Sequence, residues 1–296
     1  MSHEQTLILG FADYLQPARK LAQASGLPLA EVDLHRFPDG ETRVRLPEAL
    51  PPNVIICRSL HHPNEKLVQL LLAAAGARAL GARRLALVAP YLCYMRQDKA
   101  FHPGEVVSQK IVGRWIAEHF DGVLTVDAHL HRVTTLREAV PAQAAVNITA
   151  TQPMAAFLAE RFKQPMLIGP DGESRQWVAA IAARDGFDFE VGQKTRLGDR
   201  NVRIALPEAD YNGRDIVLVD DVASTGRTLL EAARQLQRYK PASLSVLVTH
   251  ALFVGDAIER LREAGVDNIW SCDSIPHPTN AVSLAGLLAG HLGDLN

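Results

Sequence analysis

Cysteine is scarce in this sequence: Cys57, Cys93 and Cys272 are the only three among 296 residues. Three is an odd number, and the wide spacing fits neither a disulfide framework nor a zinc site. The pattern suits a reducing cytosol. We therefore expect all three cysteines to pack in the core rather than to carry chemistry.

Two further absences exclude classes of partner. Lys and Arg total 31 against 33 Asp and Glu, so the formal net charge of −2 provides no positive field to attract nucleic acid or an anionic membrane. The most apolar stretch, residues 67–77, ends at Arg78 after about half the length that a membrane helix needs. The N-terminus, with Glu4 and Asp13 around a short apolar run, does not resemble a signal peptide. These features predict a soluble, cytoplasmic protein.

The composition is that of a globular protein, with 47% hydrophobic and 22% charged residues, and the length suggests two domains. Short apolar runs alternate with helical patterns, which predicts an α/β fold with a mainly parallel sheet. The predicted strands are 6–10, 54–57, 84–89, 123–126, 166–168, 187–192, 201–205, 215–219 and 244–249. The predicted helices are 17–25, 64–79, 108–119, 152–162, 175–185, 228–239, 255–264 and 281–292.

A short internal sequence repeat suggests that the two domains are similar. An apolar strand ending in Asp occurs at 123–127 and again at 216–220, and each is followed by Thr-Leu at the same distance. A segment containing Pro, Ala and Asn separates the halves near 141–151. We predict an N-terminal domain over 1–145 and a C-terminal domain over 146–277, with a final helix in 278–296 that packs on the first domain.

The sharpest chemical signal is residues 217–228, Val-Leu-Val-Asp-Asp-Val-Ala-Ser-Thr-Gly-Arg-Thr. A buried strand delivers Asp220 and Asp221, and a turn of small residues then opens a helix. Hydroxyl groups and free backbone N–H groups at a helix N-terminus bind phosphate, and Gly226 allows close approach. Two carboxylates beside a phosphate suit the vicinal hydroxyls of a sugar. A plain capping turn is the alternative, and the paired acids count against it.

This segment resembles the phosphoribosyl-pyrophosphate loop shared by phosphoribosyltransferases and ribose-phosphate pyrophosphokinases. Four further segments resemble the pyrophosphokinase family in particular. They are Arg-Phe-Pro-Asp-Gly-Glu at 36–41, Tyr-Met-Arg-Gln-Asp-Lys at 94–99, Thr-Val-Asp-Ala-His at 125–129 and Gly-Pro-Asp at 169–171. The resemblance implies two phosphoribosyltransferase-type domains, each a mainly parallel sheet flanked by helices. It implies transfer of pyrophosphate from Mg-ATP to ribose 5-phosphate, giving phosphoribosyl pyrophosphate and AMP for nucleotide biosynthesis.

The resemblance also implies a role for each matching residue. The implied ATP-binding residues are Phe37, Asp39, Gly40, Glu41, Arg96 and Gln97. The implied ribose-5-phosphate residues are Asp220, Asp221, Ser224, Thr225, Gly226, Arg227 and Thr228. His129 and Asp171 are the implied Mg²⁺ residues, and Lys194 and Arg196 the implied catalytic pair on a mobile flap. A homo-oligomer is implied as well, because in relatives the ATP-binding segment lies near a subunit interface.

The residues themselves leave alternatives open. Phe37 could stack on a purine, or it could belong to an ordinary Pro-Asp-Gly surface turn. His129 could bind Mg²⁺ directly or through water. Lys194 and Arg196 would point the same way in an extended segment and could offset charge on a transferring group, but a solvated hairpin would look similar.

Three departures from the family pattern stand out. Gly-Glu-Ser-Arg follows Asp171 where paired glycines are usual, Thr195 separates Lys194 from Arg196, and Arg227 is bulky for its place. Two other functions therefore remain as hypotheses. One is a phosphoribosyltransferase, which would need no ATP-binding segments. The other is a non-catalytic relative that binds nucleotide or synthetase subunits.

Overall fold

The computed structural model describes residues 6–130, 132–196 and 202–295, and of residues 194–196, 202 and 203 it describes the backbone alone. Contacts divide the chain into unit 1, residues 1–149 with 284–296, and unit 2, residues 150–283. The predicted boundary between residues 145 and 146 falls inside a strand of unit 1, so the division lies a few residues further on.

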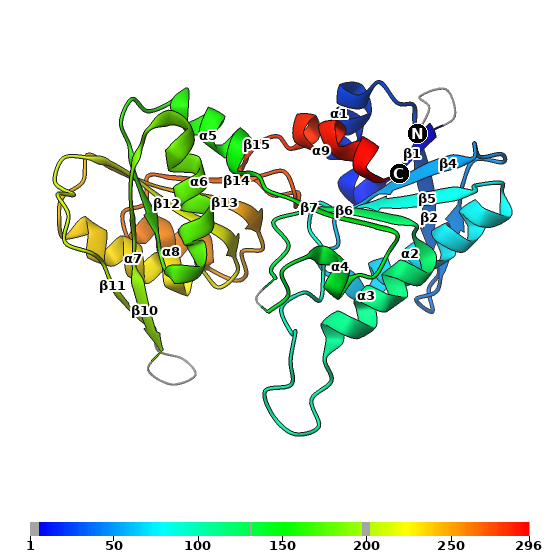
Figure 1. Cartoon of the computed structure of the whole chain (residues 1–296), viewed down its shortest axis with the longest axis horizontal. Helices are drawn as coiled ribbons and strands as arrows, with labels where there is room; N and C mark the ends of the chain where they lie inside the picture. The colour runs from blue at the N-terminus through cyan, green and yellow to red at the C-terminus, as the bar shows by residue number, and fades with distance from the viewer. Residues whose placement is uncertain (1–5, 131, 197–201, 296) are drawn as a thin grey trace. The chain divides into compact units, whose positions relative to one another are not determined.

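Unit 1 is built around a seven-stranded sheet in the order β3-β2-β1-β4-β5-β6-β7 (Figure 1). Only β3 is antiparallel. Strands such as β6, Gly-Val-Leu-Thr-Val, are buried throughout, as expected of parallel strands covered on both faces. The strands are β1 (Thr6–Phe11), β2 (Leu29–Arg36), β3 (Thr42–Arg45), β4 (Asn53–Cys57), β5 (Arg84–Val88), β6 (Gly122–Val126) and β7 (Ala144–Ile148).

Helices cover both faces of this sheet. On one face α1 (Leu15–Ser25) packs against α9 (Ala285–His291), which the chain adds only after completing unit 2. On the other face lie α2 (Pro63–Ala79), α3 (Ser108–His119) and the single turn α4 (Leu136–Ala139). The short helices η2 (Ala12–Tyr14) and η4 (Leu292–Leu295) precede α1 and follow α9. The predicted packing of the last helix on the first domain thus matches the grouping of residues 284–296 with unit 1.

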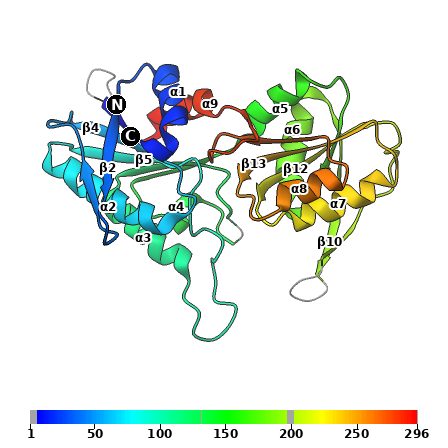
Figure 2. The same ribbon diagram turned by 180° about the vertical axis from the view of Figure 1, so that it is seen from behind.

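Unit 2 has a six-stranded parallel sheet in the order β15-β14-β13-β12-β8-β9 (Figure 2). The strands are β8 (Met166–Gly169), β9 (Asp188–Val191), β12 (Asp215–Ala223), β13 (Ser243–Ala251), β14 (Asn268–Cys272) and β15 (Asn280–Val282). A separate antiparallel hairpin, β10 (Gln193–Arg196) with β11 (Val202–Ala205), leaves the sheet between β9 and β12.

In unit 2, α5 (Thr151–Ala159) packs against α6 (Arg175–Asp185), and α7 (Arg227–Gln237) packs against α8 (Ala257–Glu263). The short helix η3 (Gly172–Ser174) connects β8 to α6. Leu229, Ala233 and Leu236 of α7 are buried against Leu218 and Val246 of the sheet, one apolar face at helical spacing. The α/β class and the two similar domains are as predicted.

Several local predictions need correction. Six strands carry no strand prediction, namely β2, β3, β7, β10, β14 and β15, and β15 takes residues assigned to the start of the last helix. β12 continues to Ala223, four residues beyond its predicted end. The cysteine prediction is confirmed, because Cys57, Cys93 and Cys272 are all buried. Among the described residues, no helix is both long and apolar enough to span a membrane.

Candidate active site

Three acidic side chains gather at the carboxyl end of the sheet in unit 2. β12 pairs with β8 in a register that places Leu218 beside Ile168. Asp171 follows the end of β8 by two residues, and Asp220 and Asp221 lie near the end of β12. Asp171 and Asp221 are 6% and 4% exposed. Burial, followed by the negative charges of Asp221 and Asp171, holds the pKa of the Asp220 carboxyl well above its ordinary value. The predicted pair Asp220–Asp221 and the predicted Asp171 thus form one cluster.

A bend and a helix start at residues 224–228, here called the phosphate seat, follow the same strand. After Ala223, Ser224 and Thr225 form a bend, and Gly226 caps α7 with a left-handed φ of +66°, a conformation that favours glycine. No side chain in the described part of the chain caps this helix, so its first N–H groups are open to a ligand. The helix begins at Arg227, one residue earlier than predicted. Thr225 and Arg227 are exposed and Ser224 and Thr228 half-buried, so the predicted residues line a reachable helix N-terminus.

The turn that carries Asp171 is held rigidly by its own sequence. The Asp171 carboxylate accepts a hydrogen bond from Glu173 N at 3.0 Å, and Ser174 Oγ donates to Asp171 O at 2.6 Å. The residues that depart from the family pattern, Glu173 and Ser174, therefore build the turn themselves. A Cβ at Gly192 would lie 2.8 Å from Pro170 O, and Gly192 N donates to Gly169 O at 2.8 Å. Glycine at 192 thus lets the base of the β10–β11 hairpin approach this turn.

The predicted flap is a β-hairpin. Lys194 and Arg196 lie within β10, at positions paired with Ile204 and Val202 of β11, rather than on the connection between two strands. The connecting residues 197–201 lie outside the described residues. Gln235 of α7 donates to Ile204 O at 2.6 Å, which fastens β11 to the helix that begins at the phosphate seat.

Magnesium fits the acidic cluster chemically. Mg²⁺ prefers oxygen ligands, keeps several waters and needs only one or two carboxylates beside substrate phosphates. Three crowded carboxylates, one with its pKa raised by burial and then by the charges of the other two, favour a nearby cation. Within the described ranges, no group of three or more His, Cys, Asp or Glu side chains has the arrangement of an all-protein metal site. His129 belongs to unit 1, where it follows β6 and is half-buried.

The first predicted ATP-binding segment is the exposed turn between β2 and β3. Phe37 N donates to Glu41 O at 2.8 Å, Gly40 adopts a φ of +95°, and Glu41 N donates to the Asp39 carboxylate at 3.1 Å. The ring of Phe37 is 40% exposed and meets His35 edge-on with centroids 4.8 Å apart. An aromatic face and two carboxylates are therefore presented to solvent on a closed turn.

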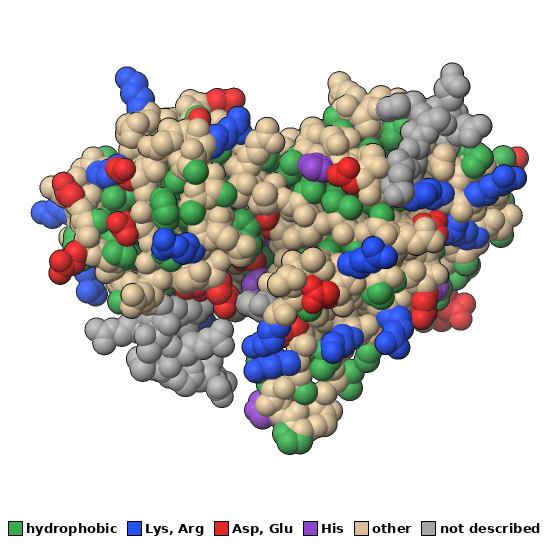
Figure 3. Space-filling view, in the orientation of Figure 1, with side chains coloured by type: hydrophobic (Ala, Val, Ile, Leu, Met, Phe, Trp, Pro, Cys, Tyr) green, Lys and Arg blue, Asp and Glu red, His purple; other side chains and the backbone are tan. Residues whose placement is uncertain are grey.

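The second predicted segment lies in the long connection between β5 and α3. Arg96 is exposed and Gln97 half-buried, while Met95 beneath them is buried and its carbonyl accepts from Gln109 at 3.1 Å. Figure 3 shows Lys and Arg side chains gathered over this connection and α3. Both segments contact the start of α2. Tyr94 of the second segment donates a hydrogen bond to Asn64 at 2.5 Å. Arg36 of the first segment forms an ion pair with Glu65 at 3.2 Å.

One ion pair at this place escapes sequence reasoning. Asp98, whose side chain is 1% exposed, accepts from Arg132 at 2.6 Å. The pair joins the 94–99 segment to the residues that follow His129. The two residues are 34 positions apart, so only the fold reveals the contact.

Comparison with known proteins finds related sequences along both units. Residues 7–119 match the N-terminal domain of ribose phosphate pyrophosphokinase, and residues 145–286 match the phosphoribosyl transferase domain. The ribose-phosphate pyrophosphokinase of Methanopyrus kandleri is 36% identical over 294 residues, covering 98% of this chain and 99% of that protein. That of Thermococcus kodakarensis is 30% identical over 260 residues, covering 88% and 91%.

A solved structure shares the whole fold. The phosphoribosylpyrophosphate synthetase of Mycobacterium smegmatis superimposes with a TM-score of 0.81 over 97% of both chains, at 22% sequence identity. The similarity extends through both units.

Proposed function

Because this chain belongs to the ribose-phosphate pyrophosphokinase family, whose members are enzymes, we propose that it transfers the pyrophosphoryl group of ATP to the 1-hydroxyl of ribose 5-phosphate. The hydroxyl oxygen attacks the β-phosphorus, and the bond from the β-phosphorus to the α-phosphate oxygen breaks. The products are phosphoribosyl pyrophosphate, AMP and the proton of the hydroxyl group.

One observation carries the proposal: a phosphate seat and buried carboxylates share one strand end in unit 2. The N–H groups at the start of α7, with Ser224, Thr225 and Thr228, would bind the 5-phosphate. Asp220 and Asp221 would accept hydrogen bonds from the ribose hydroxyls. Such a transfer depends on positioning and charge neutralisation more than on covalent work by the protein.

The remaining roles follow the predicted assignments. Phe37 would stack on the adenine while Asp39, Gly40 and Glu41 contact it, and Arg96 and Gln97 would contact phosphate and base. Lys194 and Arg196 would offset the charge that develops on the transferring group. Asp171, and His129 directly or through water, would hold Mg²⁺, which when bound neutralises part of the phosphate charge.

A homo-oligomer is part of the proposal. The side chains of Val68, Leu71 and Leu72 on α2 are 56%, 36% and 42% exposed, at the spacing of one helical face. An apolar helix face of this kind supports self-association through unit 1. The buried, reduced cysteines support a cytoplasmic location.

An AMP-release assay with ATP, Mg²⁺ and ribose 5-phosphate tests the proposal. AMP should appear in equal amount to phosphoribosyl pyrophosphate, and omission of either Mg²⁺ or the sugar phosphate should abolish both. Consumption of phosphoribosyl pyrophosphate with a nucleobase would indicate a transferase instead. A folded protein that binds ATP yet forms neither product would be a non-catalytic relative.

A further inference from the structure

Unit 1 contains a polar network at the place where open α/β sheets bind ligands. Its strand order reverses between β1 and β4, since β2 lies beyond β1 on one side and β5 beyond β4 on the other. Ligands of such sheets bind at the carboxyl ends of the strands beside this reversal. Here β1 leads into Asp13, and β4 leads into Arg58, Ser59 and His61.

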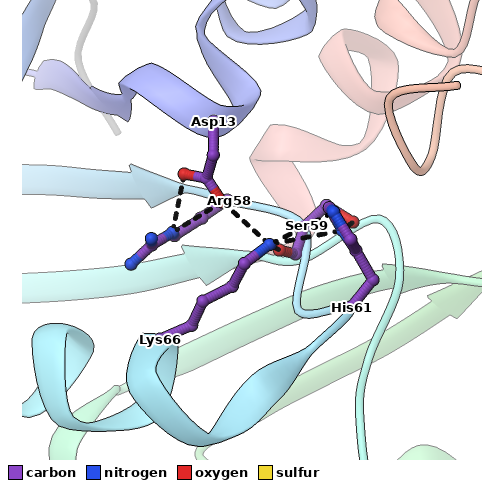
Figure 4. A network of polar contacts seen from close by, with 5 residues as sticks. All are labelled: Asp13, Arg58, Ser59, His61 and Lys66. Atoms are coloured by element: carbon purple, nitrogen blue, oxygen red, sulfur yellow. Dashed lines mark hydrogen bonds and ion pairs between the residues drawn. The ribbon is translucent and has the colours of Figure 1, made fainter.

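These side chains converge (Figure 4). The Asp13 carboxylate accepts from Arg58 Nε at 3.0 Å and lies 2.8 Å from Lys66 Nζ. Lys66, in the first turn of α2, also donates to Ser59 O at 2.8 Å and lies 3.3 Å from His61 Nδ1. Arg58 stacks on the ring of Phe11, 4.2 Å from its centroid. The network therefore joins both strands of the reversal to the helix that follows.

The charges in the network do not balance. Arg58 and Lys66 are 4% and 8% exposed, and among the described residues Asp13 is the one carboxylate that pairs with them. Burial, together with Lys66, lowers the pKa of His61 to about 4, so His61 is neutral at neutral pH. Arg58 Nη1 is buried and has no hydrogen-bond partner among the described residues. Two buried cations thus face one anion, and one of their donors is unused.

A structural ion pair would be built differently. Most other pairs in the described chain match one cation with one carboxylate, as in Arg132–Asp98 and Arg214–Asp188. Asp33 is shared by Arg43 and Arg45, but both of those arginine side chains are more than half exposed. In the network the cations are buried and the carboxylate is the reachable member, with 34% of the Asp13 side chain exposed. A small anion arriving from solvent could therefore take the position of the Asp13 carboxylate, or bind beside it, without opening the core.

We propose that Asp13, Arg58 and Lys66 form a second ligand site, which takes the phosphate group of a small anion at the reversal of strand order in unit 1. Arg58 would bind phosphate oxygens through its planar fork and Lys66 as a point charge. The N-terminus of the 17-residue helix α2 adds partial positive charge beside Lys66. In unit 2, the helix in the same topological position is α7, whose N-terminus forms the phosphate seat.

The variant Asp13→Asn tests this site through stability. It removes the internal competitor and leaves two buried cations without a counter-ion, so its melting temperature should fall in buffer free of multivalent anions. Inorganic phosphate at constant ionic strength should restore it, because a ligand of the folded state stabilises that state. Phosphate should bind about tenfold more tightly than to the parent protein, since charge-assisted bonds to Asp13 no longer compete.

Matched variants separate this effect from phosphate bound in unit 2. The parent protein reports the unit 2 contribution, and Asp188→Asn, which breaks an exposed and balanced pair with Arg214, should gain nothing from phosphate beyond it. Adding Lys66→Met to Asp13→Asn should abolish the extra stabilisation. If phosphate stabilises Asp13→Asn no more than the parent, the proposal is wrong.

A second measurement does not depend on the folding of Asp13→Asn. Calorimetric titration with inorganic phosphate should detect one more site per chain in the parent than in Lys66→Met, because unit 2 contributes equally to both. Equal phosphate binding by the two would overturn the proposal. Repeating the titration with glycerol 3-phosphate distinguishes the sources: preference for the ester indicates a phosphorylated metabolite, and preference for inorganic phosphate indicates the free anion.

Discussion

The two units share one topology and carry opposite chemistry at the same place in it. Read in chain order, β1, β2, β4, β5, β6 and β7 of unit 1 occupy the positions of β8, β9, β12, β13, β14 and β15 in unit 2. In unit 1 the antiparallel strand β3 lies between β2 and β4 in the chain. In unit 2 the antiparallel hairpin β10–β11 lies between β9 and β12 in the same way. At the reversal of strand order, unit 2 presents Asp171, Asp220 and Asp221, whereas unit 1 presents Arg58 and Lys66.

This difference shows that the fold supplies the location of a site and the side chains choose its ligand. Acids that crowd together require a cation or sugar hydroxyls, and bases that outnumber their acid require an anion. We call the site of Asp171, Asp220 and Asp221 the acidic edge and that of Arg58 and Lys66 the basic edge. The following predictions test whether these two sites differ in function as they differ in charge.

The largest effect should come from the hairpin of unit 2. Lys194→Ala should lower kcat by about 10²–10³, the usual cost of one preorganised electrostatic contact, while equilibrium ATP binding stays nearly unchanged. Lys194→Arg should rescue only partly, because a planar fork places its charge differently. The matched control is Arg45→Ala in strand β3 of unit 1, which loses an exposed ion pair with Asp33 and should keep its turnover. Near-normal turnover of Lys194→Ala would remove the catalytic role.

Asp220 should act on the sugar phosphate alone. Asp220→Ala should raise the KM for ribose 5-phosphate by about 10–100-fold, since it removes hydrogen bonds to a charged group. ATP binding, measured by calorimetry, should not change. Thr228→Val, which removes one hydroxyl from the phosphate seat, should raise the same KM by a smaller factor. Equal loss of affinity for both substrates would contradict the assignment of Asp220 to the sugar.

In the absence of ligand, the ionised Asp220 carboxylate should lower the free energy of unfolding. The pKa of Asp220 is raised on folding, so its carboxyl contributes no penalty below the unfolded value of 3.8. As the pH rises, the unfolded chain ionises first and the folded state loses stability. Asp220→Asn should therefore melt a few degrees above the parent at pH 8 and at the same temperature near pH 3. Thermal unfolding across this range checks the sign, and a destabilised variant at pH 8 would refute it.

The smallest effect concerns His61 in unit 1. Its pKa falls from 6.5 to about 4 through burial and the neighbouring Lys66, opposed in part by Asp13. Above pH 6.5 it is neutral in both states, and between 6.5 and 4 the unfolded chain takes up a proton that the folded protein refuses. The parent should lose stability over that interval. His61→Gln, which retains hydrogen-bonding capacity toward Ser59 and Lys66, should lose less, and parallel curves would show that His61 does not contribute.

Local sequence pointed to Asp220 and Asp221, because the run at 217–228 contains the acids, the bend and the helix start together. Asp171, two residues beyond β8, is singled out through the family resemblance alone. The basic edge of unit 1 offered no such signal. Asp13 and Arg58 are 45 positions apart, and only the parallel pairing of β1 with β4 brings them together.

The internal sequence repeat predicted two similar domains correctly, but the two strands that form it are not equivalent in the fold. It equates β6, which ends before Asp127, with β12, yet topology equates β12 with β4 and β6 with β14. An apolar strand followed by Asp recurs because polar residues collect at the carboxyl ends of every parallel sheet. The missed strands have another cause: β2 contains Glu31, Asp33 and His35 and pairs with the edge strand β3, so its apolar pattern is weak.

The return of the chain to α9 has a consequence for synthesis. α9 packs on α1, and Arg84 donates to Leu295 O at 2.7 Å, so unit 1 is finished by residues made after the whole of unit 2. Domains generally fold as units while the chain emerges from the ribosome. We expect unit 2, although second in the sequence, to complete its native packing first, and the nascent unit 1 to wait with its α1 surface uncovered.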